Sequence, residues 1–263
     1  MPSALPPSPL ASGWGFRAKA AGYHLLGSAL VAALAAALVF LLWYPWPYSV
    51  LAGGTGLFLL ITGVDVVMGP LITFAVFDRR KPWRELRRDL AVVVALQLAA
   101  LVYGLYVMHA VRPVVMALEG DRLRVVTAND VVLEELPKAL PPLQTLSNTG
   151  PLIIATATPS TADEQFDAIQ QALGGLDMGM RPKFWRPWDD AARASSKAVA
   201  RPLAEMRKRY PERAAELDAA IQRTGRTEQQ LRYLPILARH ADWIALVDAG
   251  SGDIIGFAPF NAY

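Results

Sequence analysis

Asp65 is the residue whose surroundings most clearly indicate chemistry. It lies near the middle of the apolar stretch Gly56 to Phe77, GLFLLITGVDVVMGPLITFAVF, which is long enough to cross a bilayer as a helix. A carboxylate at that depth costs about 2.5–3.5 kcal/mol to insert, so it needs a compensating partner. Two explanations stay open. Asp65 faces a partner helix or a polar pocket, or it is protonated and hydrogen-bonded to Gln97 or Thr62 within a helix bundle.

Pro70 predicts a distortion of the same helix. A proline has no N–H to donate, and its ring crowds the carbonyl of residue i−4, here Val66. Together with Gly63 and Gly69, it is expected to kink the helix close to the buried acid.

Side chains that catalyse reactions or bind metals are otherwise few and scattered. The chain has no Cys, which excludes disulfides, thiolate metal sites and Cys nucleophiles. Of its three histidines, His24 and His109 are expected at opposite membrane edges and cannot share a site, and His240 lies far along the chain. The sequence has no motif of zinc proteases, serine hydrolases, phosphate-binding loops or calcium loops. It therefore predicts no catalytic, metal or cofactor site and no enzyme.

Hydropathy places Asp65 in the second of three membrane spans. The expected spans are 25–43, 56–77 and 90–108 within a transmembrane region covering 17–109. Residues 1–16 contain four prolines among the first nine residues and no charge, which predicts a disordered lead.

Two patterns describe the spans further. Ser28, Ala32 and Ala36 recur at four-residue spacing, which gives the first span a smooth face for close helix contact. Four aromatic residues at the link between the first two spans suit the membrane–water interface, and they are Trp43, Tyr44, Trp46 and Tyr48.

Basic residues set the expected orientation. Lys and Arg concentrate in the segment 78–89, with two more before the first span and none in the link at 44–55. The positive-inside bias therefore places the N-terminus and the 78–89 segment in the cytoplasm, and residues 110–263 in the periplasm of a Gram-negative cell. The topology determinants are Arg79, Arg80, Lys81, Arg84, Arg87 and Arg88.

Residues 110–263 are expected to form a small exported α+β domain. Two β-rich runs within Pro113–Ala128 are separated by a Gly120–Asp121 turn, and a second hairpin is expected from Trp243–Asp248 and Asp253–Ala258. The fold class is thus an α-helical membrane protein with three transmembrane helices followed by this domain, and a fragment starting near Arg112 is expected to fold alone.

Shorter elements fill the rest of the exported domain. Leu152–Thr156 predicts a strand, and Thr161 with Glu164 predicts a capped helix that ends near Leu173. Asn129 and Asp130 are expected to cap a helix at 131–136. Two charged helical stretches are expected at about 190–209 and 211–223, interrupted by Pro202 and Pro211. The Phe184, Trp185 and Trp188 cluster is either a lid over the small core or a contact surface, and core or edge packing is favoured.

The net charge of +3 does not predict nucleic-acid binding. Residues 1–109 carry eight Lys and Arg against four acids, whereas 110–263 carry eighteen against nineteen. The basic surplus therefore lies beside the membrane spans and indicates topology and contact with the lipid bilayer.

Three stretches together resemble the type IV pilin accessory proteins of the TfpX/TfpZ family. They are KAAGYHLLGSALVAAL, the block GVDVVMGPLITFAVFDRRK…ELRRDLAVVVALQLAALVYG, and RYLPILARHADWIALVDAGSGDIIG. The similarity covers about Arg17 to Gly256. It implies an inner-membrane accessory protein that binds or chaperones a specific type IV major pilin before or during pilus assembly.

The resemblance also suggests a role for the intramembrane acid. Pilins of this class have an apolar N-terminal helix with an acidic residue near its start, and this helix is embedded in the inner membrane before assembly. Asp65 is expected to pair with the pilin's terminal amine or to share a proton with its carboxyl, with Gln97 and Pro70 as further candidate pilin contacts. The exported domain is expected to cover the pilin's globular head.

Two other functions stay open at this point. One is a membrane-anchored periplasmic sensor or ligand-binding protein, although the predicted cytoplasmic segments are too short for an output domain. The other is a membrane enzyme that uses Asp65, although no second buried acid, base or metal cluster accompanies it.

Overall fold

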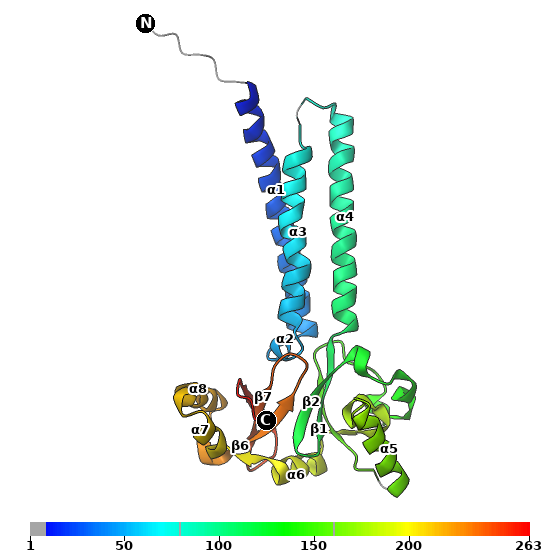
Figure 1. Ribbon diagram of the computed structural model, residues 1–263, viewed down its shortest axis with the longest axis vertical. Coiled ribbons are helices and arrows are strands. Elements are labelled where there is room, and N and C mark those ends of the chain that lie inside the picture. Colours follow the sequence, from blue (N-terminus) through cyan, green and yellow to red (C-terminus); the bar gives the residue numbers. More distant parts are fainter. Residues whose placement is uncertain (1–8, 79, 160) are drawn as a thin grey trace. The chain divides into compact units, whose positions relative to one another are not determined.

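Three long helices contain the apolar stretches of the sequence (Figure 1). They are α1 (Pro9–Leu38), which continues as a π-helical turn at Val39–Trp43, α3 (Gly54–Val76) and α4 (Trp83–Ala110). The computed structural model describes residues 9–78, 80–159 and 161–263. All three helices are long and apolar enough to cross a membrane. The predicted fold class is confirmed by these helices and the α+β part that follows.

Two helix boundaries differ from the predicted ones. Helix α1 begins at Pro9, inside the expected disordered lead, because proline is tolerated in the first turn and no proline follows it in the helix. Residues 1–8 of that lead lie outside the described residues. Helix α4 begins at Trp83, so residues 83–89 of the basic 78–89 segment are helical.

The three helices pack through small and aromatic residues. A Cβ added at Gly104 of α4 would lie 2.3 Å from Ile61 of α3, so only glycine permits this approach. The Phe40 and Phe58 rings meet edge to face at 5.1 Å. These contacts join the π-helical turn after α1 to α3, and α3 to α4.

The C-terminal part is built on one mixed sheet of eight strands, in the order β4-β3-β1-β2-β6-β7-β8 with β5 paired to β6. Antiparallel pairs join β1 to β2, β3 to β4, and β6 to β5 and β7, and also join β7 to β8. Parallel pairs join β1 to β3 and β2 to β6. The strands are β1 (Pro113–Glu119), β2 (Arg122–Thr127), β3 (Leu152–Thr156), β4 (Trp185–Pro187), β5 (Arg201–Pro202), β6 (Leu231–Leu237), β7 (Trp243–Asp248) and β8 (Ile254–Ala258).

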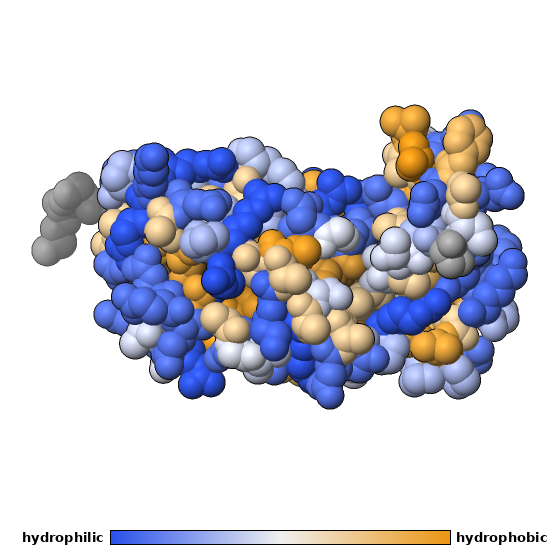
Figure 2. All heavy atoms as spheres, turned by 90° about the horizontal axis from the view of Figure 1, so that it is seen from below, coloured by the Kyte–Doolittle hydropathy of each residue, from blue (hydrophilic) through white to orange (hydrophobic). Residues whose placement is uncertain are grey.

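Helices surround this sheet. They are α5 (Ala162–Leu173), α6 (Asp190–Val199), α7 (Ala204–Arg209) and α8 (Ala214–Thr224). The face of the molecule seen in Figure 2 is mainly hydrophilic with small apolar patches, as expected of a surface in water.

The link between the first two spans is part of the C-terminal unit. Residues 42–54, which include the short helix α2 (Tyr48–Leu51), group with 110–263 rather than with the long helices. Tyr44 and Leu51 are fully buried and Tyr48 is 7% exposed. The Tyr48 hydroxyl donates to the Met116 sulfur at 3.7 Å, and burial raises the pKa of Tyr44 and of Tyr48. Tyr44 and Tyr48 therefore belong to the protein core, and the prediction that placed both at the membrane interface is wrong.

Both predicted hairpins and the β3 strand are confirmed, and the Thr161 hydroxyl accepts from the Glu164 N–H to cap α5. Core packing is also confirmed for Phe184 and Trp185, which are 6% and 1% exposed.

The predicted helix at 131–136 is wrong, whereas the charged helical stretch at about 190–209 is interrupted at Pro202, as predicted. In place of the predicted helix, residues 128–130 and 133–138 form 3₁₀ turns. The side chains of Asn129 and Asp130 accept hydrogen bonds from the Thr127 hydroxyl, so neither caps a helix. The charged stretch consists of α6, which ends at Val199, and α7, which begins at Ala204, and between them Arg201–Pro202 pairs with β6.

Candidate functional site

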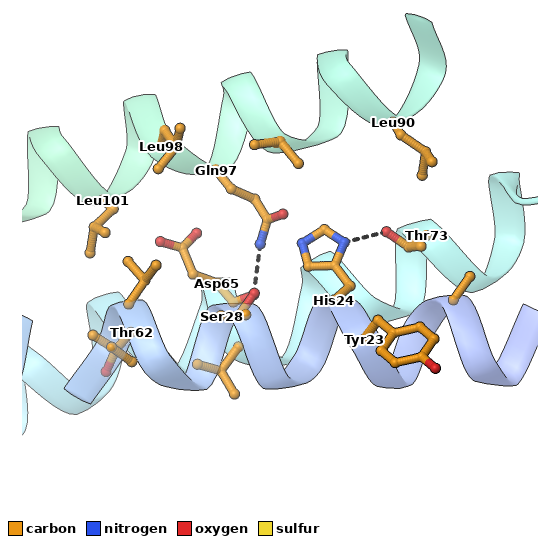
Figure 3. A pocket seen from close by; sticks show the side chains of 16 residues that line it. Tyr23, His24, Ser28, Thr62, Asp65, Thr73, Leu90, Gln97, Leu98 and Leu101 are labelled. Atoms are coloured by element: carbon orange, nitrogen blue, oxygen red, sulfur yellow. Dashed lines mark hydrogen bonds between the residues drawn. The ribbon is translucent and has the colours of Figure 1, made fainter. Parts of the chain in front are cut away.

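A cavity of about 550 Å³ lies between α1, α3 and α4 (Figure 3). Small residues of α1, including Gly27, Ser28 and Ala32, form part of its wall, and this agrees with the smooth face predicted for Ser28 and Ala32. Because short side chains leave this space unfilled, the three helices form a pocket rather than a closed core.

The cavity is open at its side. Leu98 of α4 and Tyr23 of α1 both line it, yet they are 50% and 76% exposed. In a bilayer, such surfaces face lipid or another membrane helix. The pocket is therefore accessible from within the membrane, between α1 and α4.

Asp65 projects into this cavity from α3 (Figure 3). Within the described part of the chain, its carboxylate has no hydrogen bond or ion pair. Neither of the partners considered from the sequence is bonded to it. Gln97 donates to the backbone carbonyl of Asp65 at 2.9 Å, and the Thr62 hydroxyl donates to the Phe58 carbonyl at 2.7 Å. The cost of placing this carboxylate in the membrane is thus not offset within the described bundle.

Gln97 packs directly against α3 at Gly69, because glycine has no side chain to block this approach. A Cβ at that position would lie 2.1 Å from the Gln97 Nε2 atom. Gln97 lines the cavity, but its amide N–H is already used by the Asp65 carbonyl, and its Oε1 is buried without a partner. Pro70 is within α3 but is not among the residues that line the cavity, so its contact with a partner stays a prediction.

His24 is a site residue that the sequence reasoning missed. Its Nδ1 lies 2.5 Å from the Thr73 hydroxyl and so connects α1 to α3, and its other ring nitrogen points into the cavity (Figure 3). The sequence placed His24 at a membrane edge because the first span was expected to start at residue 25. Helix α1 begins sixteen residues earlier, at Pro9, which brings His24 within the span.

The basic residues gather at one end of the helices. Arg17 of α1 lies 3.5 Å from Asp78, next to the α3–α4 turn, and Lys81 lies 2.8 Å from Asp89. The backbone N–H of Arg80 and the nearby cations lower the pKa of Asp78. The N-terminal flank and the basic segment therefore lie on the same side of the bundle, as the predicted orientation requires.

Three of the remaining predicted topology determinants lie in helix α4. Arg84, Arg87 and Arg88 lie in the first turns of α4, whereas Arg79 lies outside the described residues. In the described residues, no group of three or more His, Asp and Glu side chains is placed to hold a metal ion.

Comparisons with known proteins identify relatives along most of the chain. The family model "Fimbrial assembly protein FimB" matches residues 12–53. The serogroup I fimbrial assembly protein of Dichelobacter nodosus is 34% identical over 235 residues, which cover 89% of this chain and 91% of that protein. The serogroup E1 protein of the same organism is 33% identical over the same shares, and the protein of serogroups C1 and C2 is 43% identical over 47% of this chain and 95% of its own length. No solved structure matches.

Proposed function

This chain belongs to the fimbrial assembly protein family, and on that premise we propose that it holds a type IV pilin subunit in the inner membrane before the subunit joins the pilus. The resemblance to type IV pilin accessory proteins is confirmed by the relatives, and a role in fimbrial assembly follows from it. In the proposal, the N-terminus faces the cytoplasm and residues 110–263 lie in the periplasm.

The single observation that carries the proposal is the laterally open cavity with an unpaired acid. An α-helix with its side chains is 10–12 Å wide, so two turns of it occupy roughly 900 Å³ or more. A laterally open cavity of about 550 Å³ has room for the side chains on one face of such a helix. A pilin helix therefore lies along α1 and α4 and inserts one face between them.

Asp65 supplies the polar contact with that helix. It lies eleven residues from the start of α3 at Gly54, or about 17 Å along the axis. The group that meets it must therefore reach deep into the membrane. Two client groups fit: a terminal amine, which needs the Asp65 charge, and a carboxyl that shares a proton with it, which needs only a hydrogen-bonding partner.

Substitution of Asp65 tests this contact and distinguishes the two client groups. Asp65→Leu should reduce co-purification of the pilin, normalised to the amount of variant in the membrane. Polar contacts within membranes average about 0.6 and reach about 1.7 kcal/mol, which corresponds to about threefold to an order of magnitude or so in affinity. Asp65→Asn should behave like Asp65→Leu if the client group is the amine, and like wild type if it is a shared carboxyl.

Val67→Leu is the matched control, because Val67 lies on the same helix, is 56% exposed and does not line the cavity. Equal pilin recovery for wild type, Asp65→Leu and Val67→Leu would refute a contact between Asp65 and the client.

Photocrosslinking tests the groove independently of Asp65. Leu98 and Leu96 are neighbours on α4 and are 50% and 67% exposed, but only Leu98 lines the cavity. A photoreactive phenylalanine at Leu98 should crosslink to the pilin in cells more strongly than one at Leu96. Equal crosslinking at both positions would contradict the groove as the binding site.

A further inference from the structure

The turn between β6 and β7, residues 238–242, is held against the link that joins the first two spans. The His240 backbone N–H donates to the Leu51 carbonyl at 3.2 Å. A Cβ added at Gly53 would lie 2.4 Å from the His240 ring, so this ring lies directly on the glycine. Figure 1 shows the turn, in orange, reaching α2.

An aromatic contact holds the same turn near the other end of the link. The Trp46 ring meets the Trp243 ring, at the start of β7, with 6.2 Å between centroids, and meets the Phe257 ring at 5.9 Å. Trp46 remains 57% exposed despite these contacts. The link's tryptophan therefore packs beside the exported sheet and still presents much of its surface outward.

Chain length places these contacts close to the bilayer. Trp46 follows the last residue of the first helix, Trp43, by three residues, and an extended chain spans at most about 3.6 Å per residue, so at most about 11 Å separates them. Gly53 directly precedes α3. The turn and Trp243 therefore contact the link next to the end of the first span and next to the start of the second. This holds for either orientation of the protein in the membrane.

We propose that this turn, together with Trp46 and Trp243, contacts the phospholipid headgroups at the membrane surface. Tryptophan is favoured at this depth because its ring is apolar and its N–H is polar. Arg239 and His240 are exposed on the turn, and Arg239 bonds Asp130 at 2.8 Å while its side chain stays 56% exposed. Cationic and ring N–H donors match the phosphate of a lipid headgroup. The surface that meets lipid thus includes residues almost 200 positions after the link.

Spin labels at two turns test the proposal in the full-length chain. Because the protein has no Cys, His240→Cys and Ser251→Cys each give a single labelling site. Both positions are exposed, and they lie at opposite ends of the six-residue strand β7, about 20 Å apart. In phosphatidylcholine vesicles that contain a nickel-chelating lipid, the nitroxide at 240 should relax more strongly than the one at 251.

Equal relaxation at the two sites, or stronger relaxation at 251, would overturn the proposal. A measurement without labels supports the interpretation. Trp243→Phe should remove part of the fluorescence that brominated lipids quench, whereas Trp188→Phe should not. Trp188 donates to Asp253 at 3.3 Å and so lies beside the turn after β7, at the end of that strand remote from residue 240. An unchanged quenched fraction in Trp243→Phe would also refute the lipid contact. Only the chain and lipid are present in both experiments, so a pilin cannot cause either signal.

Discussion

The C-terminal unit is expected to lose most of its stability when the link is left out. Residues 42–54 contribute Tyr44, Tyr48 and Leu51 to its interior, at 0%, 7% and 0% exposure. Burial of a large apolar side chain is worth about 1.5–3 kcal/mol, so the three together give about 5–9 kcal/mol, as an upper estimate. A whole domain has a free energy of unfolding of only about 5–15 kcal/mol. A fragment comprising 112–263 alone is therefore expected to be unfolded or marginally stable, in contrast to the expectation from the sequence.

Urea unfolding of two soluble fragments measures this loss. One fragment contains 112–263, and the other contains the same residues preceded by 42–54 and a flexible Gly/Ser linker. With a urea m-value of about 1–3 kcal/mol per molar, a loss of about 5 kcal/mol lowers the midpoint by about 2 M or more. The linked fragment should unfold cooperatively, as followed by circular dichroism, and the shorter one should unfold at a much lower urea concentration or lack a transition.

Two substitutions in the linked fragment separate core packing from a general effect of added chain. Leu51→Ala should cost about 2–5 kcal/mol because Leu51 is fully buried. Trp46→Ala should cost less, because Trp46 is 57% exposed. Identical midpoints for the fragments with and without the link would refute the reasoning.

Three further predictions concern a glycine contact, a buried carboxylate and the membrane orientation. Gly69→Ala should displace the Gln97 amide from the Asp65 carbonyl and so lower the melting temperature in detergent by about as much as Gln97→Leu, with no further loss in the double variant; additive losses would contradict this. The N–H groups of Ser251 and Gly250, with Arg226, lower the pKa of Asp248, so its stabilising contribution is present above the ordinary carboxyl pKa of about 3.9 and is lost as pH falls through the lower folded value. Asp248→Asn should therefore destabilise the unit at pH 7 by more than at pH 3, as measured by thermal unfolding. Reporter fusions after Pro82 should be cytoplasmic and fusions at Tyr263 periplasmic, and a cytoplasmic C-terminus would overturn the proposed orientation.

Local sequence signals predicted the regular elements well. Each span is a long apolar run, and each hairpin has two β-rich runs around a glycine turn, so the information lies within a few residues. Strand β6 was missed because Pro235 lies inside it and proline argues against a strand. Its pairing with both β2 and β7 depends on residues far away in the sequence.

The site was predicted less completely for the same reason. Asp65 stands out because one acid interrupts an apolar run. His24 does not stand out, because its place in the site depends on its hydrogen bond with Thr73, 49 residues away on another helix. The aromatic residues of the link indicated that this segment packs against lipid or protein, but composition alone cannot distinguish a lipid interface from a protein core. Only the fold separates exposed Trp46 from buried Tyr44 and Tyr48.

The unpaired state of Asp65 has a consequence for the free protein. If a client group offsets the cost of this carboxylate, the chain without its client retains that cost, up to about 3 kcal/mol on insertion scales. Asp65→Leu should therefore make the free protein more resistant to thermal unfolding in detergent micelles while it weakens pilin capture. Val67→Leu, outside the cavity, should change neither property. A structural acid would give the opposite result, since its removal would destabilise the bundle. Lower stability of Asp65→Leu together with normal pilin recovery would therefore assign Asp65 to the bundle and not to the client.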